Sequence, residues 1–495
     1  TGVNSNTHFK GFFCNIRVML LHIIRKELLD QLMSLRFAVA CIVCVTVLLL
    51  SSLVLGRNYS QANASYHMNS VMHRNEVSQR TRVFDLWQGV TVDRPLNVMN
   101  VLVRGITPEL TESIKVQMSN RLEFPESYEK NPMLPLFPTV DLVFVVGIIL
   151  SLLALSFSYD AVAGEKENGV LRLMMSYSVP RDLVLLGKWV GGYLALVAPF
   201  LLSLLAALIA ILAFPEIALT VDDMLATLAL VGVSLLYLAV IYSLGLFVSC
   251  RTEQASIAIT ILLFIWVVFI LVIPNIAPYV VGRIASVPSR ESVDREKLEL
   301  GREHSRQWQQ MFEEEEKRTG KNRGELYEDE AFQARIKEMQ EQRKTEIQKI
   351  EDDYTAKIQE QARWSGMLAR ISPLTSFNLA AFNLAGAGVE QERDFVEALK
   401  SYSSTWEEYS NEKRTEFDKY MKEQRKKSKD GSITFFSGDM DRFNNLDLSD
   451  YPRFEFSLMS LKERVHQVYL DVLLLGIWAV LLFLLSYFSF LRYDV

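Results

Sequence analysis

The sequence predicts an all-α polytopic membrane protein with six transmembrane helices and a large, mainly helical insertion between the fifth and the sixth. Half of the 495 residues are hydrophobic, yet 22% are charged, and the two kinds are separated along the chain. A helix needs about 20 largely apolar residues to cross the hydrocarbon core, at a rise of 1.5 Å per residue. Core helices of a soluble protein rarely run so long without a charge, which favours the membrane class. The blocks that meet this length are 37–55, 139–159, 184–213, 224–249, 255–280 and 467–490.

The leader before the first span, residues 1–36, and the short loops indicate how the chain is oriented. The leader is too long and polar for a cleavable secretory signal, so we expect none. Basic residues in short loops mark the cytoplasmic side of a membrane, and the loop 214–223 has none. The basic residues near the other ends of the spans are Lys10, Arg17, Arg25, Lys26, Arg36, Lys166, Arg172, Arg181, Lys188, Arg251 and Arg492. We therefore expect a bacterial inner-membrane protein with both termini, including the tail 491–495, in the cytoplasm.

Two long segments then lie outside the cytoplasm. In the first, 56–138, residues 83–92 and 97–103 alternate between apolar and polar in the manner of short strands, and prolines mark the rest as loop. In the second, 282–466, apolar residues recur at helical spacing over 325–363 and again over 391–427. Ser372-Pro373, Gly386 and Gly388 separate these two stripes, which predicts an antiparallel helical hairpin or a small bundle. The stripes are typical of helix packing rather than of a ligand groove.

The loop between the second and third spans, 160–183, combines charge with an amphipathic helix. A short charged turn precedes a helix that should begin near Gly169, with Val170, Leu173 and Met174 on its apolar side and Pro180 at its end. Such a helix can lie along the inner membrane surface and present charged side chains to a cytosolic partner. An ordinary connecting loop with an interfacial helix would show the same pattern, and the residues alone do not decide between the two.

These residues resemble the signature of the ABC-2-type transporter permeases. The motif consists of Glu165, Lys166, Glu167, Gly169, Leu171 and Arg172, then Pro180-Arg181, with Gly187-Lys188 opening the next span. Thr is usual in the family where this chain has Val170. Arg25, Lys26 and Glu27 resemble the family's interfacial elbow helix, with Ile16, Leu20, Ile23 and Leu32 on one face. The six spans and the terminal Arg492-Tyr493-Asp494 also fit a subgroup with a large extracytoplasmic insertion.

The resemblance implies partners and a mechanism. The loop 160–183 would be the coupling helix that fits a cleft on an ABC ATPase subunit, and a dimer of that ATPase would bind ATP and Mg²⁺. Glu165 and Glu167 would pair with basic residues of the ATPase, and Arg172 and Arg181 with acidic ones or with lipid phosphate. A second permease subunit, identical or paralogous, would complete the pathway in the lipid membrane, and 282–466 leaves room for a periplasmic partner.

The sequence gives this chain no catalytic, cofactor or metal site of its own. No Gly-x-x-x-x-Gly-Lys-[Ser/Thr] occurs, so nucleotide is expected on the partner ATPase only. The six histidines lack ligand spacing, apart from the incidental pair His67 and His73. The net charge of −6 gives no basic field for nucleic acid. Cys14, Cys41, Cys44 and Cys250 all lie outside the two external segments, so no disulfide framework is expected.

Three functions remain open at this point. The first is the permease subunit of an ATP-driven ABC exporter, and the second is a mechanotransmission complex whose external helices act on an envelope partner without transport. The third is a membrane scaffold without a motor, for which the loop motif would be accidental. Asp141 and Asp471, at the outer ends of their spans, are interpreted as structural because both lie close to the interface.

Overall fold

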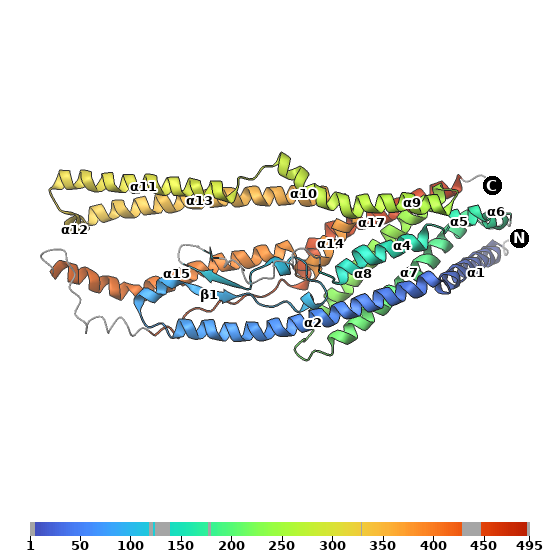
Figure 1. The fold of residues 1–495 in the computed structure, drawn as a ribbon, viewed down its shortest axis with the longest axis horizontal. Coiled ribbons are helices and arrows are strands. Elements are labelled where there is room, and N and C mark those ends of the chain that lie inside the picture. Colours follow the sequence, from blue (N-terminus) through green and yellow to red (C-terminus); the bar gives the residue numbers. More distant parts are fainter. Residues whose placement is uncertain are drawn as a thin grey trace.

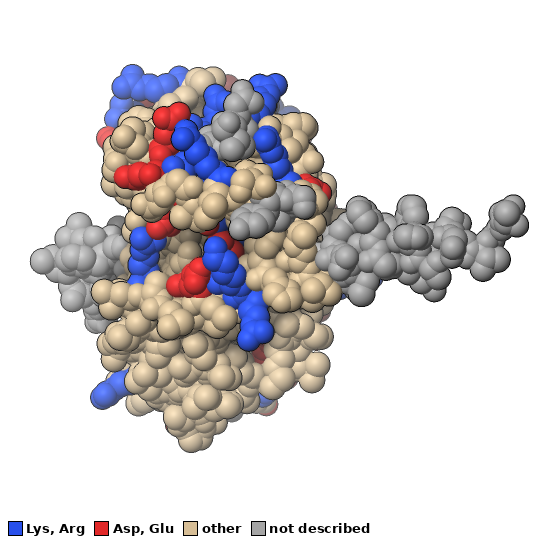
Figure 2. Space-filling model, turned by 90° about the vertical axis from the view of Figure 1, so that its right-hand side faces the viewer, with Lys and Arg blue, Asp and Glu red and all other residues tan. Residues whose placement is uncertain are grey.

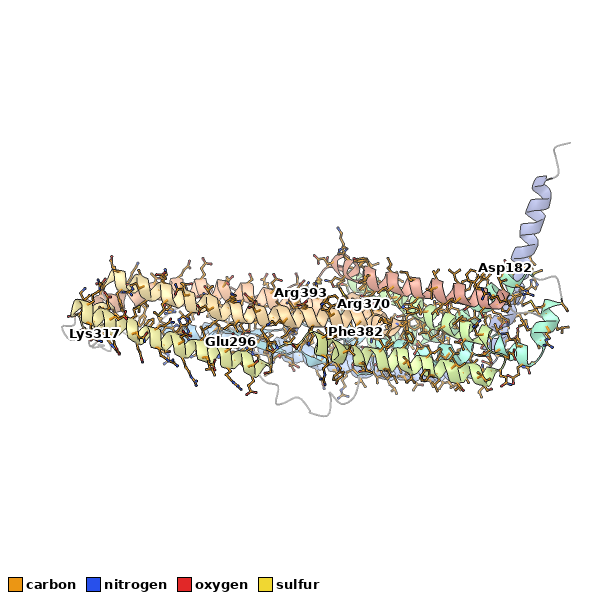
Figure 3. The ribbon with its side chains drawn as sticks, turned by 90° about the horizontal axis from the view of Figure 1, so that it is seen from above. Asp182, Glu296, Lys317, Arg370, Phe382 and Arg393 are labelled. Atoms are coloured by element: carbon orange, nitrogen blue, oxygen red, sulfur yellow. The ribbon has the colours of Figure 1, made fainter. Side chains whose placement is uncertain are left out.

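The computed structural model describes residues 5–117, 122–123, 139–176, 180–327, 329–427 and 447–492. In these ranges the protein is elongated and almost entirely helical, with both termini at one end and three long helices at the other (Figure 1). Asp182 and Lys317 mark the two opposite ends in Figure 3. Several residues used in the sequence analysis lie outside the described parts: the side chains of Cys14 and Ile16, residues 177–179, Pro125, Pro132, Pro135 and Pro138, and residues 493–495.

The six predicted spans are confirmed as helices long and apolar enough to cross a membrane. The second to fifth spans begin and end within a few residues of the predicted limits. The sixth ends close to its predicted limit but begins six residues early, after the capping box of Ser460. The spans, in chain order, are α2 (Leu35–Ser78), α3–η5–α4 (Leu142–Ser158), α7 (Arg181–Ile211), α8 (Val221–Arg251), α9–η6–α10 (Ala255–Ile284) and α17 (Leu461–Leu491). The chain is therefore an integral membrane protein, as the hydropathy pattern predicted.

The first span, α2, does not stop where its hydrophobic block stops. Its 44 residues measure about 66 Å at 1.5 Å per residue, more than twice the ~30 Å hydrocarbon core. The prediction of a loop from residue 56 onward is therefore wrong as far as Ser78. A hydropathy profile shows where a helix leaves the hydrocarbon core. The helix itself continues until its backbone hydrogen bonds are interrupted, here at Ser78. As a result, a single helix joins the bundle to the region at the end opposite the two termini (Figure 1), for which we keep the name external region from the sequence prediction.

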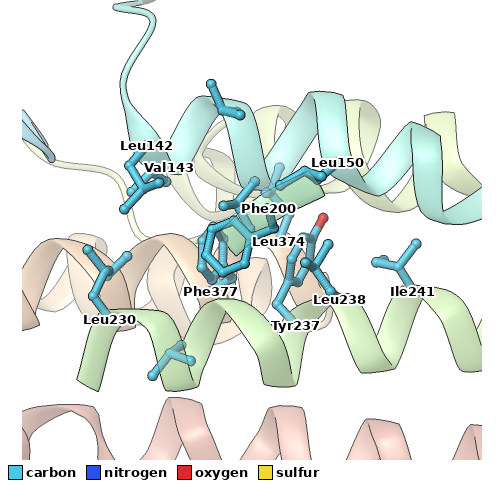
Figure 4. Packing of buried hydrophobic residues seen from close by; sticks show 14 of the residues in the cluster. Leu142, Val143, Leu150, Phe200, Leu230, Tyr237, Leu238, Ile241, Leu374 and Phe377 are labelled. Atoms are coloured by element: carbon cyan, nitrogen blue, oxygen red, sulfur yellow. The ribbon is translucent and has the colours of Figure 1, made fainter. Parts of the chain in front are cut away.

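A short apolar helix from the insertion returns to the bundle. This helix, α14 (Pro373–Leu384), packs between α8 and α17, and Leu374 and Phe377 belong to the same buried cluster as the spans (Figure 4). The ring of Phe377 is fully buried and stacks on Tyr237 of α8, with centroids 4.7 Å apart. The sequence analysis took this stretch only as a break between two stripes. The insertion is thus rooted in the bundle instead of standing off it.

Two spans contain a π-helical turn beside α14. These turns are η5 (Val145–Leu150) and η6 (Val267–Val272), and both contact α14. A π-turn removes the regular i→i−4 bond and releases a carbonyl. Here the Gly147 carbonyl accepts hydrogen bonds from the hydroxyls of Ser151, at 2.7 Å, and Tyr237, at 3.0 Å. Ser151 in turn accepts from the indole of Trp266 at 2.9 Å, which links the two π-turns.

The external region contains a helical hairpin, but its two arms differ from the predicted ones. α11 (Arg290–Thr319) and α13 (Glu330–Ala369) pair with each other through the short α12 (Arg323–Leu326). The prediction placed the stripes now found in α13 and α15 (Val389–Lys427) in a hairpin or a small bundle, and the hairpin pairing is wrong because the hairpin partner of α13 is α11. A separate small core at the hairpin tip contains Met311, Phe312, Leu326, Phe332 and Ile336.

α15 packs instead on a small antiparallel sheet. The sheet has the order β1-β2-β3, with β1 (Val90–Asp93), β2 (Ser113–Val116) and β3 (Leu122–Glu123). Its inner side chains join Phe395, Leu399 and Trp406 of α15 in a second core. Only part of the predicted 83–92 strand is β-structure, because Val83–Gln88 forms a 3₁₀ helix, η1. The predicted strand 97–103 is wrong: Val98–Val101 forms another 3₁₀ helix, η2, capped by the Asn97 side chain.

Candidate coupling site

The loop with the family motif lies at the end of the molecule where the termini lie, next to helix α1 (Ser5–Leu32) (Figure 1). It forms two short helices, α5 (Ala163–Glu167) and α6 (Val170–Met175). Gly169 joins them with φ of +73°, in the left-handed region that favours glycine, so the motif glycine sets the turn. Seen from this end, Lys and Arg side chains are interspersed with Asp and Glu (Figure 2).

The start of α5 is held by the end of α8. The backbone N–H groups of Val162 and Ala163 both donate to the Ser249 hydroxyl, at 3.0 and 2.9 Å. These groups lie at a helix start, where backbone donors lack intrahelical partners, so Ser249 supplies the acceptor that the loop itself does not. The register of the loop is therefore fixed by a span more than eighty residues away.

Two further motif residues bind the junction between α8 and α9. The Lys166 ammonium donates to the carbonyls of Cys250, at 2.5 Å, and Thr252, at 3.1 Å, where α8 ends. A cation at a helix C-terminus is favoured by the unpaired carbonyls there. The Glu167 carboxylate accepts from the Ala255 N–H at 3.0 Å, where α9 begins. Lys166 and Glu167 thus clamp the turn between two spans.

The centre of the site is Lys188 in the first part of α7. Its ammonium lies 2.7 Å from a carboxylate oxygen of Glu165 and 2.8 Å from one of Glu27, and the side chain is 2% exposed. One cation therefore joins the coupling loop, the elbow helix α1 and the third span. A buried ammonium is tolerated only when it is paired and hydrogen-bonded, and here two carboxylates satisfy it. We call Glu27, Lys188 and Glu165 the triad.

Two glycines of α7 allow α1 to approach closely enough for the triad. A Cβ at Gly191 would lie 2.7 Å from the Cβ of Glu27, and a Cβ at Gly187 would lie 2.5 Å from Ile23. Ile23, which lies on the predicted elbow face with Leu20 and the half-buried Leu32, thus meets α7. Arg25 and Lys26 point the other way and are exposed. The helix α1 therefore turns Glu27 towards α7 and leaves Arg25 and Lys26 exposed.

A second ion pair joins the loop to the start of α2. Arg36 donates to the Asp160 carboxylate at 2.8 Å, to the Tyr159 hydroxyl at 2.9 Å and to the Ser156 carbonyl at 3.1 Å. Nearby, the Ser34 hydroxyl accepts from the Phe37 N–H and caps the helix. The helix α1, through Glu27, and the start of the first span α2, through Arg36, are thus both connected to the loop.

The helix α6 is anchored by a residue outside its predicted apolar side. Leu171 is fully buried against Val162, Leu246 and Phe490, whereas Val170 is 43% and Leu173 64% exposed. The prediction made Val170, Leu173 and Met174 the apolar side, and the side chain that anchors the helix to the protein is instead Leu171. Val170, Arg172 and Leu173 are left as the exposed surface of the loop.

The other motif residues also have contacts within the chain. Pro180 begins α7, and Arg181 donates to the Leu491 carbonyl at 2.9 Å, next to the end of α17. Glu165 and Glu167, expected to pair with an ATPase, have the partners described above within the chain. The second oxygen of Glu165, Oε2, is buried and has no hydrogen-bond partner in the described ranges. The sequence analysis gave Lys188 as a basic residue and as part of the motif, but it missed the pairing of Lys188 with Glu27 and Glu165.

The two acids at outer span ends have structural partners. Asp141 caps α3 by accepting from the Phe144 N–H at 2.9 Å, and it also accepts from the Arg104 N–H. Asp471, fully buried, pairs with Arg370 at 2.6 Å, where α13 meets α14. Within the described residues there is no group of three or more metal-ligating side chains, and His73 pairs with Asp93 rather than with His67.

Comparison with known proteins agrees with the motif. A family model described as ABC-2 family transporter protein matches residues 21–495. A probable ABC transporter permease protein NosY from Pseudomonas aeruginosa is 34% identical over 132 residues, which cover 26% of this chain and 47% of the relative. The protein of the same name from Stutzerimonas stutzeri is 39% identical over 70 residues, covering 14% of this chain and 25% of the relative.

The matched stretches span about half or less of the length of these curated relatives, whereas the family model spans nearly the whole chain. The matched residues include α1 from residue 21 onward, the loop with α5 and α6, and the six spans, and therefore all three members of the triad. The chain belongs to the ABC-2 family of transporter proteins.

Proposed function

We propose that this chain is the membrane-spanning permease subunit of an ATP-driven ABC exporter, with ATP and Mg²⁺ bound by a separate ATPase that docks on α5 and α6. The observation that carries the proposal is the triad. An ATPase that pushes on α6 would move α5, and Lys188 would pass that movement to α1 and α7 together. Because Lys166 and Glu167 hold the α8–α9 junction, the fourth and fifth spans would move as well.

The docking surface would be the exposed part of α6. Leu173 and Val170 supply apolar area and Arg172 a charge. Exposed ion pairs contribute only ~0–1 kcal/mol each, so we expect apolar contact to carry most of the docking energy. A second permease, identical or paralogous, would complete the complex, with both termini in the cytoplasm.

The experiment is purification of the chain from its native membrane with its co-eluting ATPase. Leu173→Glu should abolish co-elution and ATP hydrolysis in the eluate, because it places a charge in the docking surface. Leu298→Glu, on the external helix α11, is the matched control, since Leu298 is also 64% exposed. Retention of an ATPase by the Leu173 variant, or absence of any ATPase from the wild-type eluate, would contradict the proposal.

One observation favours the mechanotransmission alternative. α2 is continuous from the membrane into the external region, and α14, whose neighbours α13 and α15 are external, is rooted between α8 and α17. Movement of the spans would therefore reach the external helices mechanically. In that case ATP hydrolysis would change the external helices and their effect on an envelope partner, and no solute would cross.

A further inference from the structure

The external region contains a pocket far from the coupling site. It has a volume of about 260 Å³ and is lined by the outer part of α2, the strand β1, Tyr402 of α15 and residues 451–455. The apolar side chains behind it belong to the core shared by the sheet and α15. We call it the external pocket. Its size suits a small ligand rather than a protein segment.

Asp93, the acid on the inner wall of the pocket, is already hydrogen-bonded within the protein. It accepts from His73 at 2.9 Å and from the Ser113 hydroxyl at 2.7 Å, and its side chain is 7% exposed. His73 Nδ1 contacts both oxygens of the carboxylate, and the Ser113 hydroxyl donates to one of them. Both oxygens of Asp93 are thus engaged by neighbouring side chains.

Two arginines supply the positive charge of the lining. Arg74 and Arg453 line the pocket, and neither forms an ion pair within the described residues, whereas the nearby Arg80 is bonded to Glu76 and to the Gly89 carbonyl. Of the two acids in the lining, Glu455 is exposed and Asp93 is engaged by His73 and Ser113. The two guanidinium groups are therefore the cationic groups of the lining that have no ion-pair partner in the described ranges.

The aromatic part of the lining lies within the field of these cations. Tyr66, Tyr402 and Tyr451 line the pocket, and the hydroxyl of Tyr402 is committed to the Pro452 carbonyl at 2.8 Å. Burial raises the pKa of Tyr451, against the nearby guanidinium groups of Arg453, Arg74 and Arg80, which act to lower it. The lining thus combines guanidinium groups with aromatic rings.

The pocket lies too far from the bilayer for a lipid headgroup. Arg74 is 19 residues beyond Leu55, the last residue of the hydrophobic block, or about 28 Å along a continuous helix. An anion that reaches it must therefore come from solution. Guanidinium groups bind carboxylate and phosphate oxygens in a bidentate manner, and tyrosine rings offer a flat apolar surface to the remainder of a ligand.

We propose that the external pocket binds a small soluble molecule that carries a carboxylate or phosphate group, held by Arg74 and Arg453 with its body against Tyr66 and Tyr451. The pocket joins α2, which continues as the first span, to the segment that leads into α17, the last span. Ligand would therefore connect the external ends of two spans. This inference does not depend on the proposed exporter function.

The test is calorimetric titration of the purified full chain in detergent with inorganic phosphate, with glucuronate, and with glucose as the neutral control. We expect saturable binding of at least one of the two anions and none of glucose, and the tighter anion identifies the group that the pocket prefers. Arg74→Ala and Arg453→Ala should each weaken binding by about tenfold or more, the loss expected for a charged hydrogen bond.

The matched control is Arg295→Ala, because Arg295 is an exposed arginine of α11 outside the pocket, and its affinity should equal that of the wild type. Arg74 and Arg453 are exposed, so an unchanged unfolding temperature without ligand should accompany each variant. The proposal is overturned if neither anion binds, if glucose binds equally well, or if the Arg74 and Arg453 variants bind like the control.

Discussion

Lys188 shows how a single residue can unite three elements of this protein. Removing one partner from a buried ion pair leaves an uncompensated charge and costs about 3–5 kcal/mol, whereas replacing all partners by neutral groups is far less costly. In the triad each carboxylate also contacts the same ammonium, so loss of Glu27 alone still leaves Lys188 paired with Glu165. The residue that matters most for stability is thus the shared cation.

We therefore expect Lys188→Met to lower the free energy of unfolding by about 3–5 kcal/mol, and Glu27→Gln to lower it by less. The triple variant Glu27→Gln/Glu165→Gln/Lys188→Met should recover most of the stability but not the stimulation of ATP hydrolysis by the permease. Thermal unfolding in detergent and the ATPase rate of the co-purified complex measure the two effects. A triple variant with normal ATPase stimulation would show that the triad only stabilises the fold.

At the scale of elements, α14 decides how the insertion is attached. A twelve-residue helix is too short to span a membrane, and its apolar residues could equally have packed against the external helices. Instead they fill a space between α8 and α17 next to two π-turns, where released carbonyls are satisfied by Ser151 and Tyr237. Packing of Phe377 on Tyr237 is the central contact of this attachment.

Phe377→Ala should therefore destabilise the protein by about 3–5 kcal/mol, the range for a large buried aromatic side chain. Ile371→Ala, two residues before α14, is the control, because Ile371 is 49% exposed and should change stability little. Thermal unfolding measures both, and hydrogen exchange should show faster exchange in the C-terminal turns of α13 for the Phe377 variant only. Equal effects of the two substitutions would mean that α14 is not seated as described.

At the scale of the whole molecule, the external region has two parts with different attachments. The sheet and α15 share a core with each other, and α2 connects them to the membrane, whereas the tip of the α11–α13 hairpin has its own core. Ion pairs along the hairpin, such as Lys297–Glu351 and His304–Glu346, join its arms below the tip. The tip can therefore be removed without opening the remainder of the hairpin.

A variant in which a short Gly-Ser linker replaces residues 305–345 should keep the unfolding temperature of the bundle and the ATPase rate of the co-purified complex. The deletion removes the whole tip cluster but retains the His304–Glu346 pair. If the hairpin acts on an envelope partner, binding of that partner should be lost while hydrolysis continues. Loss of the folded bundle would contradict the separation of tip and membrane region.

The sequence by itself determined the six spans, the position of the loop that carries the family motif, and the helical nature of the insertion. These follow from local quantities: apolar length, charge and motif spacing are all read within one segment. Only the tertiary structure decided that Lys188 binds Glu27, 161 residues away, that α13 pairs with α11, and that α14 returns to the bundle.

The physical reason is that a side-chain pattern states which face of a helix must be covered but not what covers it. The apolar stripe of α13 could be covered equally by α15 or by α11. Which of the two helices covers it depends on where α14, which connects α13 and α15, fixes their ends. In the same way, the basic character of Lys188 is compatible with a cytoplasmic loop. Its burial between two carboxylates appears only when α1, α5 and α7 are packed together.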